Sequence, residues 1–331
     1  MGGPFGTRSP NRRQLLTTAL GATAAVGVTA GGARATTPAA PQRTATILGR
    51  EVDVSHATPE VVRLFGSYFE AKSAGDVTAT MAHFARDMTY VDATLGWSWY
   101  SWQDLYDLFA QLMPTWPSSA ASYPTRILGD TRSALVCFTD TPELFGHEIR
   151  PLGAVDFRNG KIVRWIDYWD GRAFTLAGIQ EQRTPAAQFP TDFGEEKVGE
   201  RAETAIRTTV QKLSGALSSG DVSLAASLVH PDVVFEDLAL HVCIGGRVSL
   251  EAYWASALGQ LPYGAGSALR HVVGGAWGGG YEWVGPSAAP RGNTALVVDE
   301  GGLVKRFTAV WDSSLWTADA IGRLQVMSVL Q

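Results

Sequence analysis

The chain has 331 residues, of which 45% are hydrophobic and 11 are tryptophan, and its formal net charge is −5. This length accommodates two domains of ordinary size, and the apolar content excludes a largely disordered chain. The acidic balance argues against a nucleic-acid partner or an anionic membrane surface, because both usually attract basic proteins.

The first 35 residues have the features of an export signal. Arg12 and Arg13 precede a mildly apolar stretch at 15–30 that is rich in Ala, Gly and Thr, and Ala33–Ala35 offers a small-x-small cleavage site. We interpret residues 1–35 as a twin-arginine signal peptide, which predicts a secreted or extracytoplasmic protein; the alternative is a disordered terminus with an accidental arginine pair. No later stretch reaches the roughly 18 consecutive apolar residues that a membrane span needs, so no integral membrane segment is expected in the mature chain.

Residues 36–57 are expected to be a tether with a short final strand. After it, Thr58, Pro59 and Glu60 mark the start of a helix, and Gly75 and Asp76 mark its end. The later elements expected from the pattern are helices at 77–84 and 102–113 and strands at 88–93, 122–128, 133–140, 150–157 and 162–169. Helices followed by a run of antiparallel strands predict an α+β domain in which a curved sheet closes over the helices.

This pattern recurs after a linker at 181–200. The recurring landmarks are Gly75-Asp76 as Gly220-Asp221, Asp92 as Asp237, Ser101–Pro114 as Ser249–Pro262, and Gly160–Trp169 as Gly302–Trp311. Four landmarks in one order predict a tandem duplication, with domains at 58–180 and 201–331. We expect the two domains to form an intramolecular pseudo-dimer, because a duplicated domain keeps its old interface close at hand.

The strand that closes the first domain reads GKIVRWIDYW from Gly160. Side chains alternate across a strand, so Val163, Trp165, Asp167 and Trp169 are expected on one face. A carboxylate between two tryptophans would lose hydration, which raises its pKa and suits it to proton transfer. The alternative is a strand end whose aspartate is in water.

Metal and nucleotide sites are not indicated. The six histidines show no ligand spacing such as His-x-x-x-His, and the glycine-dense run at 274–280 lacks the Lys-Ser/Thr of a phosphate loop. We therefore expect no metal and no cofactor. Cys137 and Cys243 stand in apolar runs and are expected to be buried free thiols.

The Gly-Asp break, the Tyr-x-Asp strand and the closing GKIVRWIDYWDGRAF resemble the SnoaL-like branch of the nuclear transport factor 2-like superfamily. The resemblance covers both halves, specifically in the first and diffusely in the second. It implies two tandem cone-shaped domains, each a curved antiparallel sheet wrapped over N-terminal helices. The superfamily is functionally broad, so the fold by itself implies little about the reaction.

The closing strand of the first half is most similar to that of the limonene-epoxide hydrolases. This similarity implies catalytic aspartates at Asp140 and Asp167 and water-binding groups at Tyr90 and Asp92. Phe138 stands where that family has an arginine between its aspartates. Without this cation the two aspartates, if close, would tend to share one proton. Asp92 stands where the family has an asparagine, and it could instead cap the turn that follows it.

Similarity to the ketosteroid isomerases implies a further role for Tyr68, which stands at the position of their oxyanion tyrosine. In that comparison Asp92 is the general base, and Ala154 stands where a protonated carboxyl is needed, so the constellation is incomplete. The alternative for Tyr68 is a core residue. The aromatic side chains expected to contact a substrate, with core packing as the alternative for each, are Phe138, Trp97, Trp165 and Trp169.

The second half lacks two of these polar groups, because Ala309 and Phe235 stand where the first half has Asp167 and Tyr90. It is either a scaffold or the site of different chemistry. The candidates for such chemistry are Asp237, Glu236 and His241.

Together these observations predict an exported, cofactor-free enzyme that performs acid–base chemistry on an apolar polyketide-like or terpenoid-like molecule. Epoxide opening or ring closure is the expected reaction. Two alternatives stay open: an extracytoplasmic protein that binds such a molecule without changing it, and an isomerase or dehydratase centred on Asp92 and Tyr68.

Overall fold

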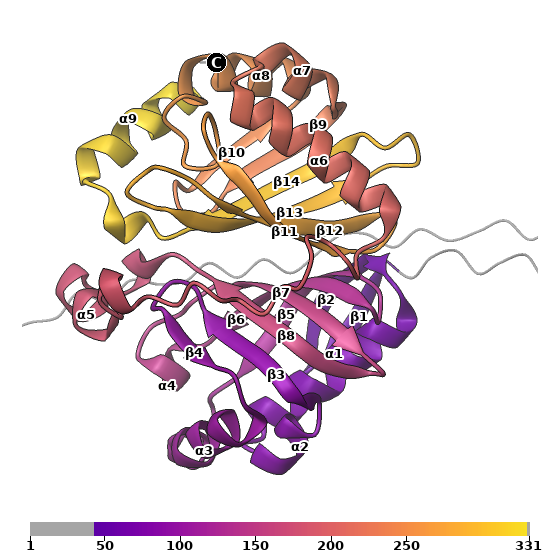
Figure 1. Ribbon diagram of the computed structural model, residues 1–331, viewed down its shortest axis with the longest axis vertical. Helices are drawn as coiled ribbons and strands as arrows, with labels where there is room; N and C mark the ends of the chain where they lie inside the picture. The colour runs from indigo at the N-terminus through magenta and orange to yellow at the C-terminus, as the bar shows by residue number, and fades with distance from the viewer. Residues whose placement is uncertain (1–42, 330–331) are drawn as a thin grey trace, which may run out of the picture. The chain divides into compact units, whose positions relative to one another are not determined.

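The computed structural model describes residues 43–329, which form two mixed β-sheets with helices (Figure 1). The expected signal peptide lies outside the described residues. The strands of the first sheet, in spatial order, are β1 (Thr44–Ile47), β2 (Arg50–Ala57), β5 (Ser122–Gly129), β6 (Ser133–Asp140), β7 (Leu152–Arg158), β8 (Lys161–Tyr168), β3 (Phe84–Asp92) and β4 (Trp97–Trp99). The helices of this half are α1 (Pro59–Ser73), α2 (Val77–Met81), α3 (Trp102–Leu112), α4 (Pro142–Phe145) and α5 (Leu176–Gln182), with 3-10 turns η1 (Met113–Thr115), η2 (Gly171–Ala173) and η3 (Ala186–Gln188).

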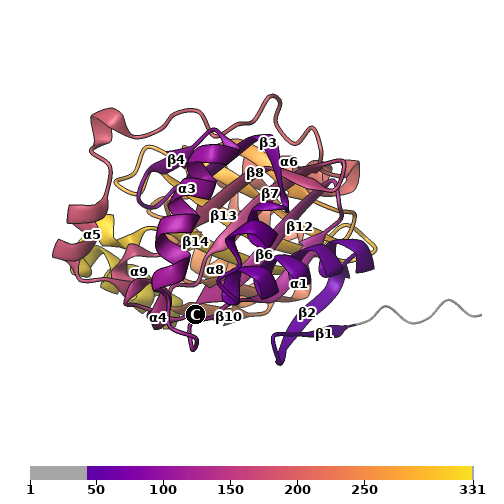
Figure 2. The same ribbon diagram turned by 90° about the horizontal axis from the view of Figure 1, so that it is seen from below.

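Local signals set the helix starts. The side chains of Thr58, Asp76 and Ser101 each accept a hydrogen bond from a backbone N–H of the first turn that follows them. Helix α1 then buries Val61, Phe65 and neighbours at helical spacing against the first sheet, and Figure 2 shows α1 and α3 lying across that face.

The first core is centred on Trp165, whose ring is in contact with aromatic rings from α1, β3 and β6. These partners are Phe65, Tyr68, Phe69, Phe84, Tyr90 and Phe138, with ring centroids 4.9–6.4 Å from that of Trp165. Such aromatic clusters stabilise a core beyond the area that they bury. The cluster places the polar edge of Trp165 beside Asp167.

The sequence predicts a wholly antiparallel sheet, but the first sheet is mixed. Strand β3 runs parallel to β8, and β2 runs parallel to β5. Hairpin connections impose antiparallel pairing on β5 to β8, whereas β3 reaches β8 only after helices and four other strands, so no turn sets its direction. Residues 44–57, expected mainly as a tether, form the β1–β2 hairpin at the edge of this sheet.

The expected alternation along the closing strand is broken at its beginning. The register between β7 and β8 shifts after Asp156, so Ile162 packs in the same core as Trp165. Val163 lies beside Arg164 at a surface cavity instead of sharing the face of Asp167. This irregularity is a β-bulge, which inserts one unpaired residue and restores the alternation beyond it.

The elements of the second half follow the order of those from α1 to α5 in the first half, without counterparts of η1 and α4. They are α6 (Thr204–Ser219), α7 (Val222–Ser227), β9 (Val229–Asp237), β10 (Val242–Gly245), α8 (Arg247–Ala257), β11 (Ala268–Gly274), β12 (Gly278–Val284), β13 (Arg291–Val298), β14 (Val304–Trp311), η4 (Ser313–Leu315) and α9 (Ala318–Val329). The strand order is β10-β9-β14-β13-β12-β11, with β14 parallel to β9. Large side chains, among them Phe235, Trp254 and Phe307, fill the space between this sheet and its helices.

The two sheets pack against each other through the faces that their helices leave uncovered (Figure 1). Ile166 and Leu135 from the first sheet and Val273 and Val310 from the second belong to one buried apolar cluster. Polar groups cross the same interface. Arg164 Nη1 and Nη2 donate to the two carboxylate oxygens of Glu282 at 2.6 and 2.8 Å, and both side chains are almost fully buried.

The two cysteines differ in burial, contrary to expectation. Cys137 is buried and Cys243 is exposed. Strand β10 is an edge strand, and its neighbours Val242 and Ile244 take the inward positions, so alternation turns Cys243 to solvent.

Candidate functional site

A cavity of about 100 Å³ lies between the first sheet and α3. The four groups expected to be catalytic, Asp167, Asp140, Asp92 and Tyr90, all line it. Its apolar wall is built from β4, α3, the connection after α4 and the segment after β8. The structure therefore brings polar residues from three strands to one cavity.

Asp167 is a buried residue of this cavity and has two hydrogen-bond donors. Tyr90 Oη donates to Oδ2 at 2.6 Å, and Trp165 Nε1 donates to Oδ1 at 2.5 Å. Gly153 lies opposite on β7, where a Cβ would approach Asp167 Oδ1 to 3.1 Å, so glycine leaves room for the carboxylate. Burial raises the pKa of Asp167 to about 7, and the hydrogen bonds from Tyr90 and Trp165 limit that rise.

Asp140 has a partner that the sequence analysis did not identify. Lys72 Nζ, from α1, lies 3.2 and 3.4 Å from the two oxygens of Asp140, and both side chains are buried. Lys72 also lines the cavity. The helical spacing that buries Val61 and Phe65 also turns residue 72 inward, and this was the available signal.

Lys72 changes the expectation that Asp140 and Asp167 share one proton. That expectation rested on Phe138 replacing a cation, but the Lys72 ammonium stands in the cavity and pairs with Asp140, while Asp167 has its own donors. Phe138 does not line the cavity. Its ring packs in the core against Phe69, with Lys72 Nζ 5.4 Å from the ring centre.

Asp92 both lines the cavity and caps a turn. Oδ1 accepts from the backbone N–H groups of Thr94 and Leu95 at 2.9 and 2.8 Å, and Oδ2 accepts from Trp169 Nε1 at 2.9 Å. Asp92 therefore caps the turn that follows it, as in the alternative interpretation, and also contacts the cavity. Burial raises the pKa of Asp92 to about 6 against the effect of these three donors.

Asp237 repeats this arrangement in the second half. It accepts from the N–H groups of Ala239 and Leu240 at 3.1 and 3.0 Å and from Trp311 Nε1 at 3.1 Å, and Tyr263 Oη donates to it at 2.8 Å. The aspartate that recurs between the halves thus has a shared structural role. Burial raises its pKa to about 6.

The other two candidates of the second half are not brought to Asp237. Glu236 lies on the opposite face of β9, where it pairs with Arg306 at 2.7 and 2.9 Å and accepts from Thr308 at 2.9 Å. His241 is exposed in the turn after β9 with φ of +53°. Glu236 and Asp237 are consecutive on β9, and consecutive strand residues point to opposite faces of the sheet, so the two carboxylates do not meet.

The aromatic candidates divide between the core and the cavity. Trp97 and Trp169 line the cavity, whereas Trp165 is core with only its N–H turned to Asp167. Tyr68 also packs in the core, 4.9 Å from Trp165 by ring centroids, and it does not line the cavity. Burial and then the charges of Asp167 and Asp140 raise the pKa of Tyr68 well above its usual value.

The cavity reaches solvent beside Trp97 and Phe145, which are 37% and 38% exposed. Trp97 is held there by its Nε1, which donates to the carbonyl of Gln182 at 2.9 Å. A cavity of about 150 Å³ holds a benzene molecule, so the enclosed space is smaller than a bulky apolar ligand needs. Such a ligand requires these two side chains to move.

Several solved structures are similar to part of the chain. A steroid delta-isomerase from Pseudomonas aeruginosa has a TM-score of 0.32 and 18% identity, over 39% of this chain and 94% of that chain. A putative ketosteroid isomerase from Kribbella flavida has a TM-score of 0.30 and 21% identity, over 41% and 97%. A SnoaL-like protein of unknown function from Burkholderia thailandensis has a TM-score of 0.30 and 12% identity, over 33% and 96%. No protein-family model and no curated protein matches the chain.

Within residues 43–329 no group of three or more His, Cys, Asp or Glu side chains is placed to hold a metal ion. Within the same range no helix is both long enough and apolar enough to cross a bilayer.

Proposed function

We propose that the first half is a cofactor-free enzyme of the SnoaL-like, nuclear transport factor 2-like type that performs acid–base chemistry on an apolar terpenoid-like or polyketide-like substrate, by epoxide opening or ring closure. The observation that carries the proposal is Asp167, buried in the wall of a largely apolar cavity with Tyr90 Oη at 2.6 Å and the Lys72–Asp140 ion pair in the same cavity. A base with a pKa near neutrality and a fixed cation are the groups that such reactions use.

Asp167 is the base in this proposal. With a pKa of about 7 it is partly ionised at neutral pH, and it takes the proton from a water molecule or from a substrate hydroxyl. The oxygen so activated attacks an epoxide carbon, and the C–O bond of the epoxide breaks. Tyr90 orients the carboxylate and the attacking oxygen.

Lys72 interacts with the epoxide oxygen as its C–O bond breaks. Its ammonium stabilises the developing alkoxide and supplies a proton to it, and the proton taken up by Asp167 returns to solvent as Lys72 is reprotonated. Asp140 then orients Lys72 and balances its charge, in place of the acid role expected from the sequence. The small volume of the cavity favours substrates at the compact end of the class.

The test is turnover of small apolar epoxides by the full chain in ¹⁸O-labelled water, with diol formation followed by mass spectrometry. Asp167→Asn is expected to lower turnover at least about a hundredfold, because it removes the base. Asp237→Asn is the matched control, since it changes the buried turn aspartate of the other half, and it should retain turnover. Equal turnover by Asp167→Asn and the unchanged chain would refute the proposal.

Two other functions give different outcomes in related experiments. An isomerase or dehydratase centred on Asp92 would exchange a carbon-bound hydrogen of its ligand with deuterium from solvent. The base of such an enzyme, Asp92, already accepts three hydrogen bonds, and Tyr68 lies in the core away from the cavity. This function is therefore less well supported. A non-catalytic binding protein would return an apolar ligand unaltered, with equal affinity in Asp167→Asn.

We also propose that the two halves arose by duplication, that their sheet-to-sheet contact takes the place of a homodimer interface, and that the chain is exported by the twin-arginine pathway. The shared turn aspartates and element order support the first, and the arginine pair at Arg12 and Arg13 supports the last. Export predicts that changing both arginines to lysine retains the protein in the cytoplasm, which fractionation of the host measures.

A further inference from the structure

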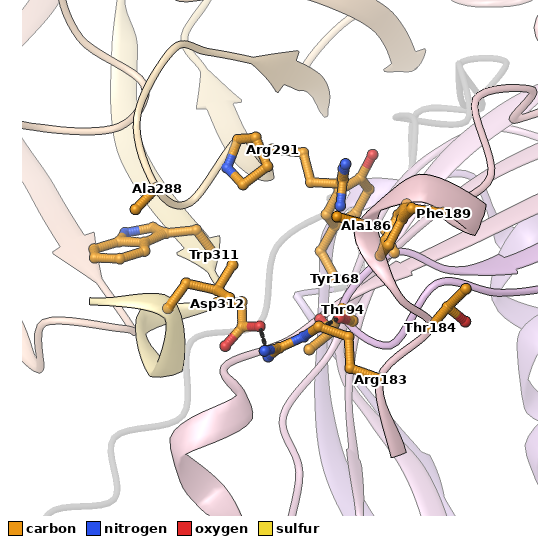
Figure 3. Close-up of a pocket in the computed structure, with 13 residues that line it drawn as sticks. Thr94, Tyr168, Arg183, Thr184, Ala186, Phe189, Ala288, Arg291, Trp311 and Asp312 are labelled. Carbon is orange, nitrogen blue, oxygen red and sulfur yellow. Dashed lines mark hydrogen bonds and ion pairs between the residues drawn. The ribbon is translucent and has the colours of Figure 1, made fainter. Parts of the chain in front are cut away.

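A second cavity, of about 190 Å³, lies beside the segment that connects the two halves (Figure 3). Its walls come from Thr94 after β3, from Arg183 and Phe189 in the connecting segment, and from Arg291 and Asp312 in the second half. None of its residues lines the cavity that holds Asp167. The two cavities are therefore distinct.

The two arginines of this cavity differ in their partners. Arg183 is paired with Asp312 and also donates to Ser314 Oγ at 2.9 Å, and Figure 3 draws its bond to Asp312. The Arg291 backbone pairs with β12, but its guanidinium forms no hydrogen bond or ion pair with any residue in the described range 43–329. Its guanidinium carbon instead lies 3.7 Å from the centre of the Phe189 ring.

The environment of Arg291 leaves its charge uncompensated. Burial, followed by the positive charges of Arg270 and Arg183, lowers the pKa of Arg291, while Tyr168 and Asp312 act in the opposite direction. Among the lining residues, two arginines face one aspartate, so the cavity carries an excess of one positive charge. Stacking on an aromatic ring satisfies one face of a guanidinium and leaves its N–H edge free to bind an anion.

Most of the remaining wall is apolar, with Thr184 and Tyr168 as its polar members. The apolar side chains are Ala93, Ala186, Phe189, Ala288, Pro290, Trp311 and Leu315. The volume exceeds the roughly 150 Å³ that accommodates benzene. A free guanidinium beside an apolar space of this size matches a molecule with one carboxylate and a compact hydrocarbon body, because planar carboxylates pair with arginine through two parallel hydrogen bonds.

We propose that this cavity binds a small monocarboxylate, with the carboxylate on Arg291 and the hydrocarbon part against Pro290 and Leu315. The site is independent of the proposed chemistry at Asp167. Because the cavity is built from both halves and the connecting segment, its ligand would also hold these three parts together.

The experiment uses benzoate as the probe and the full chain, with calorimetry for affinity and methyl NMR for location. We expect saturable binding of one benzoate with shifts of the Leu315 methyl signals. Arg291→Gln should weaken binding about tenfold or more, because a charge-assisted pair is lost. Arg50→Gln is the matched control, since Arg50 also stacks on a ring, that of Tyr123 at 3.8 Å, far along the chain, and it should bind benzoate unchanged.

A comparison on the unchanged chain keeps the test valid if Arg291→Gln folds poorly. Benzyl alcohol has the same body without the charge and should bind at least about tenfold more weakly than benzoate. The proposal is overturned if benzoate shows no saturable binding, if Arg291→Gln binds it as well as the unchanged chain, or if the shifts appear at Leu108 of the other cavity in place of Leu315.

Discussion

Lys72 Nζ lies 3.2 Å from Asp140 Oδ1, and the side chains of both residues are less than 10% exposed. The pair joins α1 to the end of β6 and places a cation inside an apolar cavity. A buried pair of this kind is seldom present for stability alone, because the loss of hydration offsets much of the attraction. Its position beside Asp167 is the reason that we assign it a role in the reaction.

The first prediction concerns this ion pair. Lys72→Met leaves the Asp140 carboxylate buried without a partner and is expected to lower the free energy of unfolding by about 3–5 kcal/mol. The double variant Lys72→Met/Asp140→Leu should recover most of that loss and still lack turnover. Urea denaturation followed by tryptophan fluorescence measures both. A single variant as stable as the unchanged chain would contradict the pairing.

The second prediction concerns the pH dependence of stability. Burial holds the pKa of Asp167 at about 7 in the folded chain, and an exposed aspartate titrates near pH 3.9. Between these two pH values the folded chain keeps the Asp167 proton and the unfolded chain has lost it. Protonation of Asp167 therefore stabilises the folded chain at low pH, and this contribution decreases as the pH rises toward 7 and is absent above it. Asp167→Asn cannot titrate. Its stability relative to the unchanged chain should therefore increase by about 2 kcal/mol between pH 5 and pH 8.

Thermal unfolding at several pH values checks this prediction. Asp237, whose pKa is about 6, titrates in both chains and therefore cancels in the difference. Asp92, whose pKa is also about 6, interacts with Asp167 and contributes a smaller change of its own. A stability difference that stays constant with pH would mean that Asp167 titrates normally in the folded chain.

The third prediction concerns the rate. If Asp167 is the base, kcat/KM should rise with pH through an apparent pKa of about 7, since only the carboxylate accepts a proton. Tyr90→Phe removes one donor to this carboxylate, which should shift the midpoint upward while turnover remains measurable. An unchanged midpoint in Tyr90→Phe would place the titrating group elsewhere.

The fourth prediction concerns the interface between the sheets. Arg164→Met leaves Glu282 buried without its cation, so we expect a loss of about 3–5 kcal/mol in the free energy of unfolding. Arg306→Met is the control, because the Arg306–Glu236 pair has the same two-bond geometry but is partly exposed, and it should cost about 1 kcal/mol or less. Similar losses for the two variants would mean that burial of the first pair has little effect.

The fifth prediction concerns the turn cap of the second half. Asp237→Ala removes the acceptor for two backbone N–H groups, Trp311 Nε1 and Tyr263 Oη, all in a buried region. Unsatisfied buried donors cost about 1–3 kcal/mol each, so the second half should unfold at markedly lower temperature. Turnover measured well below that temperature should be retained. Loss of turnover in a fully folded variant would indicate that the second half takes part in the reaction.

Features that depend on neighbours in the chain could be predicted from the residues alone. The caps at Thr58, Asp76 and Ser101 set helix starts because the capping side chain and the N–H group that it satisfies are three residues apart. Alternation placed Trp165 and Asp167 on one face, and the recurrence of Asp92 as Asp237 marked a turn in each half.

Contacts between groups far apart in the chain became known from the folded structure. It paired Lys72 with Asp140, set β3 parallel to β8, separated Glu236 from Asp237, and left Arg291 without a counterion within residues 43–329. The bulge at Val163 and the size of the cavity also became known only from the folded structure. These features depend on register, packing and contacts between residues far apart in the chain, and local spacing carries no information about which of several possible partners a buried charge will find.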